Sequence, residues 1–255
     1  MHDFIMNFGF EVDFGMSFFA MMIIVFLAGI IRGFTGFGSA LLTVPALAVL
    51  YGPAQAVVIE ILIEIPVSLG LLRLSIREAE RKTILPMLAM FFVFVPFGTL
   101  LLTVANPDYV KVVMSLFVLA SVALMAQQSK AAALMSPKLN YVVGAISGTT
   151  QGLTGMAGPL FATALMARGD DNVRTRANIS ALAGGIICIS VVSFWLMGLM
   201  TAEAIFYAVL ASPAIMLGVW VGAILFRTMS HLNLRPLILG FLAFIAVATL
   251  FETLV

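Results

Sequence analysis

The residues best suited to chemistry lie around two short glycine-rich motifs of the same pattern. The first motif is Gly-Phe-Thr-Gly at 33–36, directly after Arg32, and the second is Gly-Leu-Thr-Gly at 152–155, directly after Gln151. Corresponding glycines are 119 positions apart (152 − 33 and 155 − 36). Both motifs interrupt long apolar stretches, and paired interruptions of this kind indicate the binding site of a transporter.

Arg32 is the charge that tells most about the chemistry. An arginine near the middle of a bilayer costs about 2.5–3.5 kcal/mol on insertion scales, so such a residue usually faces a cavity. Its planar guanidinium offers a fork of donors that suits sulfonate or carboxylate oxygens. The alternative is that residues 14–31 form a full span and Arg32 is an ordinary flanking charge on the cytoplasmic side.

The glycines and their polar neighbours supply the rest of a predicted anion site. Glycine permits backbone that other residues rarely adopt, and free N–H groups at a helix start lie at the positive end of the helix dipole. We expect two such helix starts, one from each motif, to converge on one site. The alternative is that the glycines only allow helices to cross closely. The predicted substrate-binding residues are Arg32, Gly33, Thr35, Gly36, Gly38, Ser39, Gln151, Gly152, Thr154, Gly155, Gly158 and Asn178.

Two acidic residues, Glu60 and Glu64, lie inside the apolar segment 54–73. Their i, i+4 spacing places both on one helix face, and acidic groups inside a span rarely face lipid. One interpretation is that they carry a proton during transport, because burial and mutual repulsion favour protonation of one carboxyl. The alternative is a static ion pair with Arg32 or Arg73.

The elements that position these residues are predicted to be membrane helices. Hydrophobic residues make up 62% of the 255 residues and charged residues 10%, whereas soluble domains have about 45–50% and about 25%. The chain is therefore expected to be an all-α, polytopic membrane protein. The single cysteine, Cys188, indicates neither a disulfide nor a metal site, and His2 and His231 are too far apart to form a metal cluster. No cofactor is predicted.

The apolar segments fall into two similar series. A full span needs roughly 20 residues, and three segments of each series are long enough. The first two segments of each series are shorter and are separated only by the glycine-rich motif, so they form either two tilted spans or a re-entrant hairpin. The segments are about 14–31, 34–50, 54–73, 84–104 and 109–127, and then about 139–152, 154–167, 177–197, 203–226 and 233–253.

The number of crossings predicts that the two halves have opposite orientations. A glycine-broken or re-entrant pair starts and ends on the same side, and three further spans then bring the chain to the other side. The chain is thus predicted to form two inverted-topology repeats, an N-terminal repeat at 1–130 and a C-terminal repeat at 131–255. Residues 1–15 lack the basic start of a signal peptide, so the first apolar segment is expected to be retained.

The distribution of basic residues gives the expected orientation. With both termini outside, Lys111 is the only clear loop cation outside, whereas the reverse orientation violates the positive-inside rule. The basic residues then predicted to lie in the cytoplasm are Arg73, Arg77, Arg81, Lys82, Lys130, Lys138, Arg168, Arg174, Arg176, Arg227 and Arg235.

The motifs resemble the signatures of the TauE/SafE family. The residues Arg-Gly-Phe-Thr-Gly-Phe-Gly at 32–38, followed by Pro45, are similar to its N-terminal signature, and 148–159 are similar to its second signature. Members are sulfite and organosulfonate permeases of bacterial inner membranes. The resemblance implies a multi-pass protein of that membrane that transports, and commonly exports, sulfite, an organosulfonate or a related carboxylate.

The predicted function is therefore secondary transport of a small anion by alternating access of the two halves. The alternative is a channel-like anion pore on the same fold. An intramembrane enzyme is disfavoured, because neither histidine is placed to serve a buried serine. The partners expected are the anion and the lipid bilayer, with no nucleic acid, and association into a homo-oligomer is left open.

Overall fold

The computed structural model describes residues 15–75, 77–126, 139–228 and 235–254, and every regular element among them is a helix. This confirms the all-α prediction. The helices are α2 (Met16–Thr35), α3 (Ser39–Tyr51), α4 (Pro53–Ser75), α5 (Arg81–Val104), α6 (Pro107–Ala126), α7 (Leu139–Thr154), α8 (Gly158–Ala167), α9 (Asn172–Leu196), α10 (Ala202–Thr228) and α11 (Arg235–Leu254).

Within the described residues, six helices are long and apolar enough to cross a membrane. They are α2, α4, α5, α6, α9 and α10. Large apolar side chains are exposed on most of these helices, such as Phe92 on α5, Trp195 on α9 and Trp220 on α10, as expected of helices that face lipid. The structure thus confirms a multi-pass membrane protein, while α3 and α8, with 13 and 10 residues, are much shorter.

The two glycine-rich breaks begin a few residues later than predicted. The helices continue through Gly33 and Gly152, and the chain leaves the helix at 36–38 and at 155–157. Gly36 and Gly155 end the preceding helices with positive φ angles of 86° and 70°. Each of these two glycines donates its backbone N–H at 2.8 Å to the carbonyl oxygen four residues earlier. A left-handed glycine with this bond is a common helix terminator, which explains why the break does not start at the first glycine of each motif.

Gly33 and Gly152 instead lie where helices cross. A Cβ atom added to Gly33 would lie 2.2 Å from the carbonyl oxygen of Val219 on α10. One added to Gly152 would lie 2.1 Å from the carbonyl oxygen of Val95 on α5. Small residues four apart, such as Gly29 with Gly33, allow this close backbone approach in membranes.

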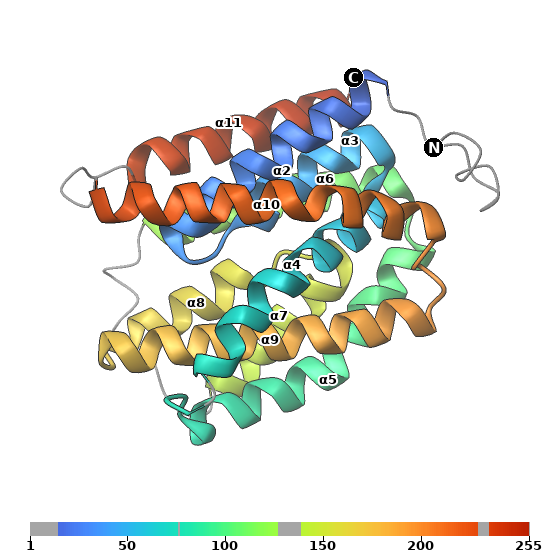
Figure 1. Ribbon diagram of the computed structural model, residues 1–255. Coiled ribbons are helices and arrows are strands. Elements are labelled where there is room, and N and C mark those ends of the chain that lie inside the picture. Colours follow the sequence, from blue (N-terminus) through green and yellow to red (C-terminus); the bar gives the residue numbers. More distant parts are fainter. Residues whose placement is uncertain (1–14, 76, 127–138, 229–234, 255) are drawn as a thin grey trace.

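Helices from the two halves of the chain pack on one another (Figure 1). α2 packs on α10, α7 on α5, α4 on α9 and α6 on α11. The predicted boundary between the halves, at residues 130 and 131, lies outside the described residues. The breaks therefore lie inside a joint assembly of both halves, next to the central pair α4 and α9.

The bundle has one end rich in basic residues, which we call the basic end. Figure 1 shows the α4–α5 and α8–α9 connections at this end, and the α5–α6 and α9–α10 connections at the other. Lys111, which is 3.7 Å from Asp108, lies at the other end. Lys130 and Lys138 are outside the described residues. The described basic residues in the connections and helix termini of the basic end include Arg77, Arg81, Lys82, Arg168, Arg174, Arg176, Arg227 and Arg235.

Candidate functional site

A small cavity lies between the two breaks and brings together many of the predicted site residues. Its volume is about 50 Å³, and since about 10–15 Å³ suffices for one water molecule, it has room for a few waters or one small anion. The cavity is bordered by both breaks and by the central helices α4 and α9. The lining residues that were already named in the sequence analysis are Arg32, Gly38, Ser39, Glu60, Glu64, Gln151, Gly155 and Gly158.

Arg32 lies in the last turn of α2 and borders this cavity. Its side chain is only 9% exposed, and Nη2 lies 3.0 Å from Oε2 of Glu64. Its Nε has no hydrogen-bond partner among the described residues. The guanidinium is therefore buried, partly neutralised by one carboxylate, and left with a free donor. The alternative combined a full span at 14–31 with a flanking charge. The helix α2 is long and apolar enough to cross a membrane, and Arg32 in its last turn is buried rather than exposed.

Glu64 links three helices of the first half. Besides Arg32 of α2, it accepts a hydrogen bond from the hydroxyl of Ser39, the first residue of α3, and one at 3.4 Å from Ser68. Such a buried pair is costly to break, because removing one partner leaves an uncompensated charge and costs about 3–5 kcal/mol. The ion pair with Arg32, which is the alternative to proton transfer in the sequence analysis, is thus present for Glu64. The side chain of Arg73, the other partner considered, is outside the described part.

Glu60 lies one turn before Glu64 and borders the same cavity, but it has a different environment. Its side chain is 1% exposed, and neither carboxyl oxygen has a hydrogen-bond partner among the described residues. Burying an isolated carboxylate costs several kcal/mol or more. Glu60 is therefore a buried acidic side chain that borders the cavity and lacks the ion pair and hydrogen bonds that Glu64 has.

The N-termini of two short helices border the cavity from opposite halves. α3 begins at Ser39, and α8 begins at Gly158 with Pro159 in its first turn. A Cβ atom added to Gly158 would lie 4.0 Å from Cβ of Phe37, so the start of α8 lies close to the first break. The first N–H groups of a helix have no partner within it and lie at the positive end of its dipole. Two such ends beside Arg32 make this part of the cavity favourable for an anion.

The threonines of the motifs stabilise the helix ends rather than line the cavity. Thr35 donates its hydroxyl hydrogen bond to the carbonyl oxygen of Ile31 at 2.8 Å. Thr154 does the same to Thr150 at 2.7 Å. The hydroxyl donors of these two predicted substrate-binding residues are therefore engaged by the backbone.

Asn178 and Gln151 hold backbone groups in place. The Asn178 carbonyl oxygen accepts the N–H of Glu80 at 2.7 Å, which ties α9 to the start of α5. Asn178 is not among the cavity-lining residues. Gln151 does border the cavity, and its side-chain oxygen accepts the N–H of Ala157 at 3.1 Å. Gln151 thereby orders the second break, and its amide nitrogen is the group that remains for a ligand.

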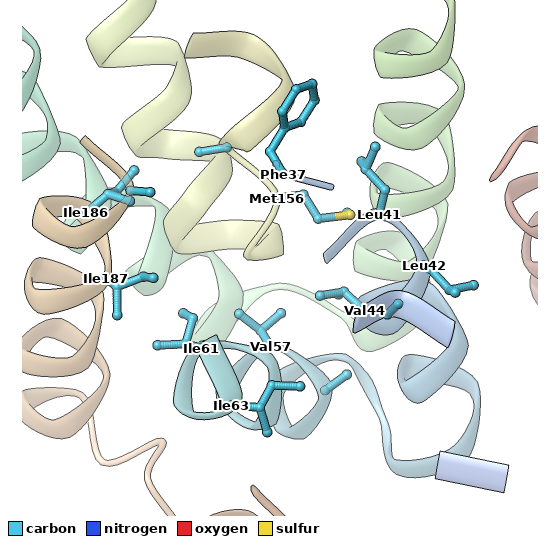
Figure 2. Close-up of a cluster of buried hydrophobic side chains, with 14 of the residues drawn as sticks. Phe37, Leu41, Leu42, Val44, Val57, Ile61, Ile63, Met156, Ile186 and Ile187 are labelled. Atoms are coloured by element: carbon cyan, nitrogen blue, oxygen red, sulfur yellow. The ribbon is translucent and has the colours of Figure 1, made fainter. Parts of the chain in front are cut away.

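The apolar walls of the cavity were not predicted from the sequence. Ile61, Phe161, Ala183, Ile186 and Ile187 border it, and Figure 2 shows several of them with Phe37 and Met156, one side chain from each break. Nothing in the sequence distinguishes them, because isoleucines and alanines in apolar helices are common on every face. Only the positions of α8 and α9 against α4 bring them to the site.

The fold and the cavity define the class of the protein: a multi-pass helical membrane protein whose buried charged site lies between two glycine-broken helix pairs, the build of a membrane transporter. The family described as "Sulfite exporter TauE/SafE" matches residues 21–249. The chain therefore belongs to the TauE/SafE family, a family of membrane transporters, which confirms the resemblance noted from the motifs. No curated protein and no solved structure gave a match.

Proposed function

We propose that the protein is a secondary transporter that exports a small anion, such as sulfite, an organosulfonate or a related carboxylate, across the bacterial inner membrane. The observation that supports this best is the buried Arg32 guanidinium, which borders the cavity with Nε free. In this proposal the anion lies between Arg32 and the N-termini of α3 and α8. Planar guanidinium donors match the oxygens of a sulfonate or carboxylate.

The proposed binding mode has the anion compete with Glu64 for Arg32. Glu64 lies 3.0 Å from Nη2 of Arg32 and is also bound by Ser39. An arriving anion takes guanidinium donors away from Glu64, whose charge then lacks its partner. Uptake of a proton by Glu60 or Glu64 relieves this, because it removes one negative charge from the site. Anion transport is therefore proposed to be coupled to proton movement through these two residues.

Alternating access of two inverted halves is the proposed mechanism. Helix contacts support it, since α2 on α10 and α7 on α5 are the same contact with the halves exchanged. A symmetric arrangement of this kind allows a site at its centre to open to either side. We propose that the basic end is cytoplasmic and that both chain termini lie outside, as the positive-inside rule requires.

Binding by purified protein variants tests the proposed site. Arg32→Gln should weaken binding of sulfite, an alkylsulfonate or a short carboxylate by at least about tenfold, because hydrogen bonds to a charged group contribute about 1.5–3 kcal/mol. The double variant Arg32→Gln/Glu64→Gln removes both charges of the pair and guards against misfolding of the single variant. Arg227→Gln, at the exposed end of α10, is the charge-matched control.

Two results would contradict the proposed function. One is parent-like affinity in a folded Arg32→Gln or double variant, and the other is no binding of any of these anions to the parent. Counterflow in proteoliposomes separates the transporter from the pore. A transporter exchanges labelled anion against excess unlabelled anion, whereas a pore shows flux that rises without saturation.

A further inference from the structure

A second, larger cavity lies on the basic-end side of the first break. Its volume is about 330 Å³, several times that of the inner cavity. Gly36 and Phe37 border it, and the next two residues, Gly38 and Ser39, border the inner cavity. The same short segment of chain therefore separates the two cavities. Phe37 is 7% exposed, and its ring packs with the buried apolar side chains around the breaks (Figure 2).

The charged side chains at this larger cavity are Arg176 of α9 and Glu78 of the α4–α5 connection. Both are exposed. The hydroxyl-bearing residues Thr35 and Ser180 also border it. Arg174, two residues before Arg176, is exposed as well but is not among the lining residues. Among the side chains that the structure describes, Arg176 is thus a cation that faces the cavity, and Arg174 is a neighbouring cation that does not.

We propose that this cavity is a capture site for the transported anion, in which Arg176 concentrates anions before they pass Phe37 to reach Arg32. A charge at the mouth of a low-dielectric cleft raises the local concentration of the opposite ion. Glu78 works against Arg176, so the balance of the two sets the strength of the site. This inference rests on the proposed function, because it supplies the route by which the anion enters the inner cavity.

Cysteine chemistry measures anion enrichment in the cavity without any transport assay. The protein is Cys188→Ser/Ser180→Cys, which leaves a single thiol on the cavity wall. Two thiol reagents are compared, the anionic 2-sulfonatoethyl methanethiosulfonate and the neutral methyl methanethiosulfonate. The ratio of their rates reports how strongly the cavity favours an anion, and the anionic reagent is itself a small organosulfonate. Val173→Cys, also on the cavity wall, provides a second position.

Three charge variants in this background are expected to change the rate ratio in different directions. Arg176→Gln should lower the anionic-to-neutral rate ratio by about threefold or more at low salt, and added salt should reduce the difference. Glu78→Gln should raise the ratio. Arg174→Gln, the matched control, should leave the ratio near that of the parent.

Equal ratios in Arg176→Gln and Arg174→Gln would overturn the capture site, and so would failure of both cysteines to react with the neutral reagent. Either failure is distinguishable from failure of the proposed function, which is measured by anion binding at Arg32. A parent that binds anions but shows no effect of Arg176 retains the inner site and loses only the capture site.

Discussion

The two breaks occupy equivalent places in the two halves of the chain, yet only the first has charged side chains. Arg32 precedes the first break, and Gln151 holds the matching position before the second (151 − 32 = 119). Glu64 corresponds in the same way to Ala183 (183 − 64 = 119). All four line the inner cavity. The positions of the ion pair in the first half are thus occupied by a neutral amide and a methyl group in the second half. The charged side chains that line the cavity therefore all come from the first half.

The breaks also differ in their access to the surroundings. Gly36 is exposed and borders the larger cavity. In the second break, Met156 and Ala157 are fully buried, as is Thr154 just before it. The two breaks therefore differ at their glycines: Gly36 is exposed although Phe37 and Gly38 are buried, whereas the whole second break is buried. Under the proposed function, this is a state open to the basic end, and the exposure of the two breaks exchanges when the protein opens to the other side.

The largest loss of stability is expected at the helix crossings, where the two halves of the chain are alike. Gly33→Ala and Gly152→Ala should each destabilise the protein by about 3 kcal/mol or more, because the added methyl group would meet a backbone carbonyl at 2.2 or 2.1 Å and overpacking of this kind strains both helices. Thermal unfolding of the purified variants in detergent measures the loss. Similar losses in both variants are expected, since both glycines lie at equivalent crossings.

Gly70→Ala is the matched control for these crossings. Gly70 lies inside α4, and an added Cβ atom would have nothing within 4 Å. Alanine there should be neutral or stabilising, by up to about 1 kcal/mol. Unchanged melting temperatures in both crossing variants would mean that α2 and α7 do not approach their partners so closely.

Sequence periodicity and composition were sufficient to predict the helical membrane fold. The repeated motif was sufficient to place Arg32, Ser39, Gln151 and Gly158 near one another. The sequence could not separate the glycines that end helices from those at crossings, because both types occupy the same four-residue motif. That distinction depends on φ at Gly36 and Gly155 and on the helix that packs against Gly33 and Gly152, and packing partners are not encoded locally.

The roles of the polar side chains were equally hard to predict. Asn178 is predicted to bind the anion. Its side-chain oxygen accepts the N–H of Glu80, a residue 98 positions away in the chain, and its Nδ2 has no hydrogen-bond partner among the described residues. Glu60 and Glu64 both border the cavity, as expected of residues on one helix face, but their spacing does not explain why only Glu64 pairs with Arg32. The rotation of α4 relative to α2 decides which carboxylate has a partner.

A smaller loss of stability is expected at the glycines that end α2 and α7. Its size should differ between the two halves of the chain. Gly36→Ala should cost about 1–2 kcal/mol, because an L-residue is strained at positive φ. Gly155→Ala should cost more, because its Cβ would also meet Cγ1 of Val57 at 3.1 Å, whereas Gly36 has open space. Melting temperatures of the two variants measure the difference. If Gly36→Ala proved the more damaging, the second break would not be the packed one.

The smallest effect on anion affinity is expected at Glu60, and it should appear only as a change in pH response. Glu60 is buried without a hydrogen-bond partner among the described residues, so glutamine, which keeps its shape without its charge, should change anion affinity by about twofold or less. If Glu60 binds the transported proton, however, Glu60→Gln should abolish the acceleration of anion flux by a pH gradient in proteoliposomes. Asp108→Asn, which removes an exposed carboxylate far from the cavity, should keep that acceleration.

Because the second half has no acidic residue at the cavity, a Glu60→Gln variant that still responded to the gradient would leave Glu64 as the proton carrier. The same response in Glu64→Gln as well would show that the charged half binds the anion without moving a proton.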